Sequence, residues 1–204
     1  MSRRLSSIAL ASVVAIAGVS VVPHIRSAPA AVMQESTSYE IDSLHSTIVF
    51  SALYMGQSPF YGMFTATSGT MTYDGTNPST LQVDITAPLA SLDTHNSDRD
   101  AHLKSPDWFN APEHPNVRFV GGSPSDNGDG TMTMQGELTL NGQTNPVTVT
   151  VQHLKAGNTP RGQRMGLGAT FTIKRTDFGV NTMVGENGIG DEITLHVGLQ
   201  GLAG

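Results

Sequence analysis

The sequence contains no cysteine among its 204 residues. This absence excludes disulfide bonds, thiolate metal ligands, a cysteine nucleophile and a lipid attached to an N-terminal cysteine. Basic residues are also scarce, because 11 Lys and Arg stand against 17 Asp and Glu, which gives a formal net charge of -6. Nucleic-acid binders generally need a basic surface to displace the counterions of the phosphates. We therefore expect no nucleic-acid partner.

The common signatures of catalysis are missing as well. The sequence has no Gly-x-Ser-x-Gly elbow, no glycine-rich phosphate loop and no His-Glu-x-x-His helix. Hydrophobic residues make up 38% of the chain and charged residues only 14%, a composition typical of a packed domain. These features favour a non-catalytic protein with a substantial core.

The first thirty residues have the order of a secretory signal peptide. Arg3 and Arg4 precede an uncharged apolar run from Ile8 to Val22, and small residues around Ala30 follow. The run is shorter than the roughly 20 residues of a membrane-spanning helix. We expect cleavage near Ala30 and export to the periplasm or the extracellular space, with an uncleaved membrane anchor as the alternative.

Three segments are predicted along the chain: a signal peptide (1–30), a flexible lead-in (31–38) and one folded domain (39–204). Residues 1–30 hold three arginines and no acidic residue, so the remainder carries 8 basic and 17 acidic side chains, a formal charge near -9. This charge disfavours electrostatic docking on anionic membranes. Any exchange with a bilayer is expected to need an apolar rim or a partner protein.

Period-two alternation of apolar and polar residues predicts strands from Tyr39 onward. Val147, Val149 and Val151 are one example, and the Asn141-Gly142 pair before them is a typical hairpin turn. About eight strands are predicted, at 39–54, 61–73, 81–88, 116–121, 131–140, 146–155, 166–175 and 192–199.

One segment is predicted to be helical. Asn96 or Ser97 can cap residues 98–104, which have acids in the first turn and Lys104 in the last, and Pro106 ends the helix. Eight antiparallel strands with one short helix indicate an all-β fold and fit a closed barrel slightly better than a sandwich.

Two groups of polar residues are candidates for chemistry. His95, His102 and His114, with a nearby carboxylate, could hold a metal ion in an exported metal-binding protein or enzyme. The structural alternative is that acids begin the helix while Arg99 pairs with a carboxylate to fix it to the barrel. Near the end of a predicted strand, Arg175 and Asp177 are expected to form a structural ion pair.

The apolar residues suggest an interior that can take a ligand. Methionine and phenylalanine are frequent in and beside the predicted strands, and a lining rich in Met adapts to a flexible apolar molecule. An eight-stranded barrel is just wide enough to hold one small ligand when its side chains do not fill it. The alternative is an interaction domain whose core is filled by its own side chains.

Several separate segments resemble the YceI-like family of exported lipid- or polyisoprenoid-binding proteins. They occur in the family's order and span about residues 39–199: Asp42-Ser43-Leu44-His45-Ser46, Gly62-Met63-Phe64, Ser91-Leu92-Asp93-Thr94, Arg99-Asp100-Ala101-His102-Leu103-Lys104-Ser105, Asp107-Trp108-Phe109-Asn110, His114-Pro115-Asn116-Val117-Arg118-Phe119, Gly136-Glu137-Leu138-Thr139-Leu140-Asn141-Gly142 and Arg175-Thr176-Asp177-Phe178-Gly179.

The resemblance implies an extended, eight-stranded antiparallel lipocalin-like barrel with one short helix and a long apolar pocket. The expected ligand is an isoprenoid or quinone-like lipid, no further cofactor is expected, and homodimers occur in the family. The residues we expect to line the pocket are Phe50, Tyr54, Phe60, Phe64, Phe109, Phe119, Met134, Phe171 and Phe178.

Two departures from the family pattern concern a ligand headgroup. Tyr54-Met55-Gly56 stands where the family usually has a His-Leu-Gly-like run, and His114 stands where it often has tyrosine. Tyr54 retains a hydroxyl that can donate a hydrogen bond.

Overall fold

The computed structural model describes residues 35–185 and 187–204. These residues contain eleven β-strands, one α-helix and four short 3-10 helices. The predicted signal peptide and the first half of the predicted lead-in lie outside these residues. The elements run in the order β1 (Thr37–Ile41), β2 (Thr47–Tyr54), β3 (Ser58–Phe64), β4 (Ser68–Tyr73), β5 (Gln82–Pro88), β6 (Leu92–Asp93), α1 (Ser97–Lys104), β7 (Asn116–Asp126), β8 (Met132–Leu140), β9 (Gln143–Thr159), β10 (Gly162–Lys174) and β11 (Ile189–Ala203).

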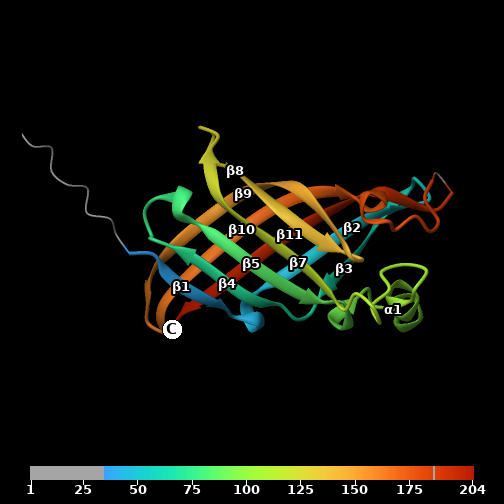
Figure 1. Cartoon of the computed structure of the whole chain (residues 1–204), viewed down its shortest axis with the longest axis horizontal. Coiled ribbons are helices and arrows are strands. Elements are labelled where there is room, and N and C mark those ends of the chain that lie inside the picture. Colours follow the sequence, from blue (N-terminus) through green and yellow to red (C-terminus); the bar gives the residue numbers. More distant parts are fainter. Residues whose placement is uncertain (1–34, 186) are drawn as a thin grey trace, which may run out of the picture. The chain divides into compact units, whose positions relative to one another are not determined.

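The strands form a closed antiparallel barrel (Figure 1). Its ring runs β1-β4-β5-β7-β8-β9-β10-β11, and β11 closes it by pairing with β1, with Tyr39 opposite Ala203. The long β11 also pairs with β2 nearer its start, where Leu195 is opposite Phe50. Strands β3 and β6 extend the sheet from β2. The predicted eight-stranded barrel is confirmed.

Two of the predicted long strands are interrupted. Segment 39–54 divides into β1 and β2 at a 3-10 turn, Ser43–His45, which is capped by Asp42. Segment 61–73 divides into β3 and β4. Because β1 pairs with β4 and β2 pairs with β3, each divided segment still acts as one bent strand of the ring.

The predicted flexible lead-in, residues 31–38, extended two residues too far. Thr37 and Ser38 already belong to β1, opposite Tyr73 and Thr72 of β4. Both residues are β-formers or neutral in strands, and pairing satisfies their backbone groups.

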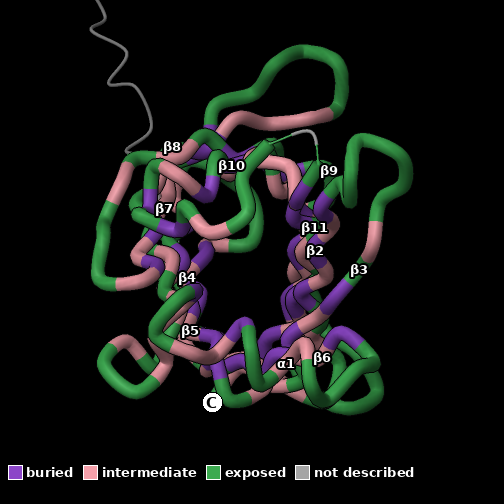
Figure 2. Tube along the Cα trace, turned by 90° about the vertical axis from the view of Figure 1, so that its right-hand side faces the viewer, coloured by how far each residue is buried: buried purple, intermediate pink, exposed green. Residues whose placement is uncertain are grey.

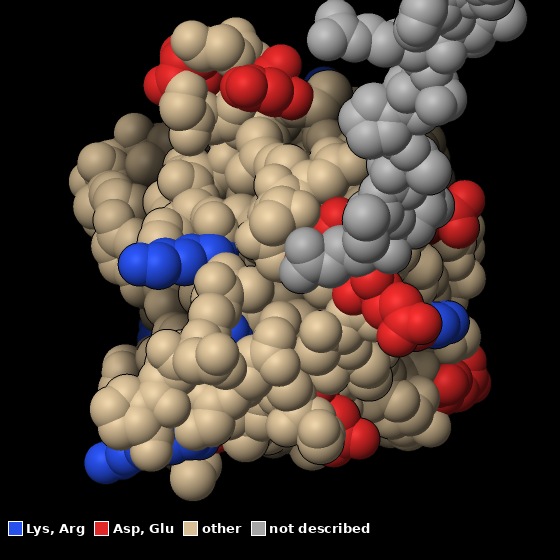
Figure 3. Space-filling view, turned by 90° about the vertical axis from the view of Figure 1, so that its left-hand side faces the viewer, with Lys and Arg blue, Asp and Glu red and all other residues tan. Residues whose placement is uncertain are grey.

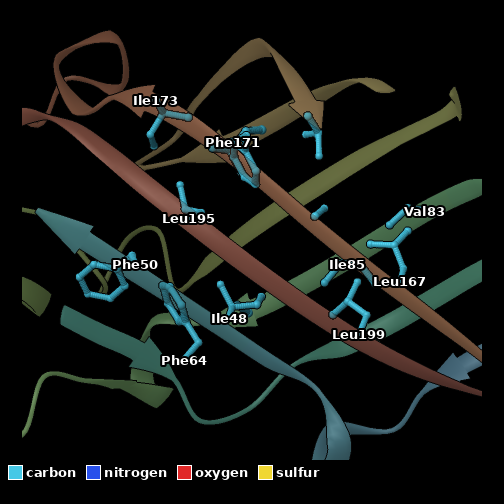
Figure 4. Close-up of a cluster of buried hydrophobic side chains, with 14 of the residues drawn as sticks. Ile48, Phe50, Phe64, Val83, Ile85, Leu167, Phe171, Ile173, Leu195 and Leu199 are labelled. Carbon is cyan, nitrogen blue, oxygen red and sulfur yellow. The ribbon is translucent and has the colours of Figure 1, made fainter. Parts of the chain in front are cut away.

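Alternate side chains of the strands point into the barrel, as the sequence pattern predicts. On β10 the buried residues are spaced by two: Met165, Leu167, Ala169, Phe171 and Ile173. Figure 2, viewed from the end that carries α1, shows buried segments around the interior. Figure 4 shows apolar side chains from β2, β5, β10 and β11 turned toward one another.

Helix α1 has the predicted limits. The Asn96 side chain accepts a hydrogen bond from the Arg99 amide at 2.9 Å, and Ser105 follows the last turn. Leu103 is its one buried residue. No helix in the described residues is both long and apolar enough to cross a membrane.

Among the described residues, all charged side chains except that of Arg175 are exposed or only partly buried. On the face drawn in Figure 3, basic side chains are scattered, in places among uncharged residues and elsewhere beside acidic side chains. Arg118 of β7 donates two hydrogen bonds to Asp84 of β5, at 2.9 and 2.7 Å, and both side chains are largely exposed. Because solvent screens an exposed pair of this kind, it contributes little to stability.

Asp42 fixes the turn between β1 and β2. Its carboxylate lies 2.7 Å from His45 Nδ1 and 3.2 Å from Arg164 Nη1, and it accepts a hydrogen bond from the Leu44 amide. The bond to His45, followed by the one to Arg164, lowers the pKa of Asp42 below its usual 3.8, although partial burial opposes the shift.

The lowered pKa of Asp42 predicts an acid-sensitive contribution to stability. The contribution is present above the unfolded-state pKa and is lost as the pH falls through the lower folded-state pKa. In urea titrations across this range, Asp42→Asn should lose less stability on acidification than the wild type. Glu40→Gln, on the neighbouring strand, is the control and should follow the wild type. Equal acid sensitivity in the Asp42 variant would contradict this assignment.

Candidate functional site

Two adjoining apolar cavities occupy the interior of the barrel. The first, here the central cavity, measures about 60 Å³, and the second, the helix-side cavity, about 70 Å³. They share the walls formed by Phe64, Val117, Leu138 and Leu195. The helix-side cavity also reaches Leu103 of α1 and the aromatic residues that follow the helix.

The lining of these cavities suits an apolar occupant. Every residue around the central cavity is apolar, and Arg175 is the single polar residue around the helix-side cavity. On this measure one water needs roughly 10–15 Å³, but it also needs two to four polar partners. The cavities are therefore large enough for water and chemically unsuited to it.

Seven of the nine predicted pocket residues line these cavities. Phe50, Phe60 and Phe109 line the helix-side cavity, and Phe119, Met134 and Phe171 line the central cavity. Phe64 borders both. The Phe119 and Phe171 ring centroids are 6.3 Å apart, and those of Phe50 and Phe64 are 6.1 Å apart.

The other two predicted residues lie elsewhere. Tyr54 is at the outer end of β2 and is 47% exposed, because the barrel interior ends before it. Phe178 is buried, but it lies in the 3-10 turn Arg175–Phe178 and borders neither cavity. We therefore remove both from the set of interior lining residues.

Arg175 is an interior residue whose role the sequence did not reveal. It is only 2% exposed, and its guanidinium donates to the carbonyls of Val180, Thr182, Ile189 and Gly190 at 2.8–3.1 Å. Its Cζ also lies 5.2 Å from the centroid of the Trp108 ring.

These contacts replace the predicted ion pair with Asp177. Within the described residues no carboxylate lies within 4 Å of the Arg175 guanidinium. Burial lowers the pKa of Arg175, and the nearby charge of Asp191 opposes that shift. Arg175 therefore links Val180 and Thr182 in the loop before β11 to the first two residues of β11, at the wall of the helix-side cavity.

The proposed metal ligands are not brought together. His102 accepts a hydrogen bond from Trp108 Nε1 at 3.2 Å, His95 is exposed, and the ring of His114 lies against Gly142. In the described part of the chain, no three His, Cys, Asp or Glu side chains could hold one metal ion. The described structure therefore does not arrange these three histidines as one metal site.

The residues around the start of α1 have a structural role. Asp100 accepts hydrogen bonds from the amide and the hydroxyl of Thr94, at 2.9 and 2.6 Å. Arg99 donates to the Thr94 hydroxyl at 2.8 Å and lies over the Phe60 ring. Arg99 thus fixes the helix as expected, but through Thr94 and Phe60 instead of a carboxylate.

Comparison with known proteins places this barrel in a family. The family profile described as YceI-like domain matches residues 39–200. The chain belongs to the YceI-like family. Protein YceI of Escherichia coli is 34% identical over 170 residues, which cover 82% of this chain and 87% of the relative.

Solved structures of similar proteins share the YceI-like fold. BcnA of Burkholderia cenocepacia aligns with a TM-score of 0.67 and 23% identity, over 78% of this chain and 98% of BcnA. A polyisoprenoid-binding domain from Saccharophagus degradans aligns with a TM-score of 0.62 and 15% identity, over 82% of this chain and 99% of that domain. At these identities the matches establish the fold alone.

Proposed function

We propose that this YceI-like protein binds a long-chain isoprenoid or similar amphiphilic lipid inside its barrel, without catalysis. The observation that carries the proposal is the pair of adjoining cavities with an almost wholly apolar lining. The Saccharophagus degradans domain, which has the same fold and is described as polyisoprenoid-binding, supports this ligand class. Transport, storage or a stress response in the cell envelope would each use such binding.

The cavities are too small to hold a long lipid tail without rearrangement of their lining. Volumes of about 60 and 70 Å³ hold only part of a long tail, so binding requires the lining side chains to move apart. Met134 has three rotatable side-chain bonds and can adapt in this way. Each methylene transferred from water contributes roughly 0.8 kcal/mol, so several methylenes offset the cost of ordering the tail.

The proposal places the protein in the cell envelope, because residues 1–30 have the order of a secretory signal peptide. The absence of cysteine makes the folded state independent of the redox conditions there.

Native mass spectrometry of the gently purified protein tests the function directly. We expect a lipid bound at close to one equivalent, and solvent extraction would identify it. The same spectrum reports whether two copies associate, as the family resemblance leads us to expect. An empty protein that also refuses added isoprenoid, quinone and fatty acid would contradict lipid binding and favour an interaction domain with a filled core.

A further inference from the structure

A group of exposed apolar side chains gathers where two loops meet at the α1 end of the barrel. Leu53, Tyr54 and Met55 form the tip of the β2–β3 hairpin, and Met183 and Val184 belong to the loop before β11. We call these five residues the tip patch. Their exposed fractions lie between 41% and 53%, although they are large and apolar. Figure 1 shows the two loops at the same end as α1.

Backbone contacts hold the two loops together as one surface. The Met55 amide donates to the Gly188 carbonyl at 2.7 Å, and Ile189 is paired with Tyr54. Within the second loop, the Ile189 amide donates to the Met183 carbonyl at 2.8 Å. Arg175 fixes the ends of this loop through the four carbonyls described above. The tip patch is therefore supported from two sides.

The two methionines have an unusual backbone. Met55 has φ of 52° and Met183 has φ of 55°, in the left-handed region that long side chains rarely adopt. Asparagine or glycine would be more favourable at such positions. The fold thus has large apolar side chains at two exposed turns where local backbone energetics disfavour them, which points to a function for the side chains.

The tip patch adjoins the cavity that the proposed function uses. Ala52 and Ile189 line the helix-side cavity, and their chain or pairing neighbours Leu53 and Tyr54 are in the patch. Residues 53–61 carry no charge, and Glu186 is the single charged residue of 178–190. A contact made by this surface is therefore governed by apolar burial more than by charge.

We infer that the tip patch docks the protein on the surface of a lipid bilayer, where cargo passes between membrane and barrel. This inference rests on the proposed function, because a long isoprenoid leaves or enters water only at great cost and so needs direct contact with a membrane. Leucine, valine and methionine side chains suit the fluid acyl region, and tyrosine suits the headgroup boundary. An acidic protein is repelled by anionic headgroups, so docking depends on uncharged lipids.

A double variant changes the tip patch and is expected to leave the fold intact. Met55→Asn with Met183→Asn removes two apolar side chains and supplies a residue that favours the left-handed backbone, so the variant should fold at least as well as the wild type. Leu44→Asn is the matched control, because Leu44 is 92% exposed but lies in the 3-10 turn between β1 and β2, outside the patch.

The experiment measures co-sedimentation of the purified exported protein with phosphatidylcholine vesicles. We expect the wild type and Leu44→Asn to bind. The affinity of the double variant for the vesicles should be lower by about tenfold or by a larger factor. Adding phosphatidylglycerol should not strengthen binding, and high salt should not weaken it. Binding that the double variant retains, binding that requires anionic lipid, or no vesicle binding by the wild type would each overturn the inference.

Cargo is measured separately, by native mass spectrometry of each variant. If the tip patch only docks, the double variant keeps the bound lipid of the wild type while losing vesicle binding. A wild type that binds vesicles but holds and takes up no lipid would contradict the proposed function and leave the docking surface standing. The two failures are thus distinguishable.

Discussion

Replacing Arg175 with methionine is expected to lower the free energy of unfolding by about 3–5 kcal/mol, because each buried carbonyl that loses its donor and stays unpaired costs roughly 1–3 kcal/mol. The guanidinium is almost fully buried and satisfies four backbone carbonyls at the ends of loop 180–190. Methionine fills much of the same volume but donates no hydrogen bond, so these carbonyls lose their partner. Urea denaturation followed by tryptophan fluorescence measures the change, since Trp108 lies against Arg175.

Arg118→Met is the matched control for this prediction. The chemical change is the same, but Arg118 pairs with Asp84 on the exposed face of the barrel. Its loss should lower the free energy of unfolding far less than the loss of Arg175, because solvent screens the exposed pair. If the two variants were equally stable, the carbonyl contacts of Arg175 would not fix the loop as we describe.

Enlarging Ala169 to leucine is expected to weaken lipid binding by roughly fifty-fold. Ala169 is buried on β10 and lines the central cavity, so three added carbon atoms occupy space that the tail would use. Excluding about three methylenes at roughly 0.8 kcal/mol each gives this factor. Titration with geranylgeraniol, followed by native mass spectrometry, measures the affinity.

The stability of Ala169→Leu distinguishes exclusion of the ligand from damage to the barrel. The cavity can accept the larger side chain, so the free energy of unfolding should change by no more than about 1–2 kcal/mol. Thr150→Leu, at the exposed position on β9 next to Val151, the residue paired with Ala169, should leave affinity unchanged. Undiminished binding by Ala169→Leu would show that the tail does not occupy the central cavity.

The strands could be predicted because burial of one sheet face leaves period-two alternation in the sequence. Phe171, which was predicted to line the pocket, does lie inside the barrel. Tyr54 continues the inward alternation of Ile48, Phe50 and Ala52, but it lies beyond the end of the interior. Alternation reports which face a residue is on and not where the barrel stops.

The role of Arg175 could not be predicted for a different reason. Its partners are backbone carbonyls of a loop that follows several residues later, and carbonyls are the same in every sequence. The neighbouring Asp177 was therefore the only visible candidate partner. The interruption of segment 39–54 was missed similarly, because a three-residue 3-10 turn capped by Asp42 leaves apolar alternation on both sides.

The pairing of β1 with β11 has a consequence for folding kinetics. Tyr39 and Ala203 meet in the ladder, so the ring closes through contacts between strands that are far apart in sequence. Such high contact order slows folding, because the entropy of a large loop is lost before the closing contacts form. A chain that is still being synthesised lacks β11 and leaves β1 and β10 as open edges. The barrel can therefore close only after β11, the last strand of the chain, is available to pair with both edges.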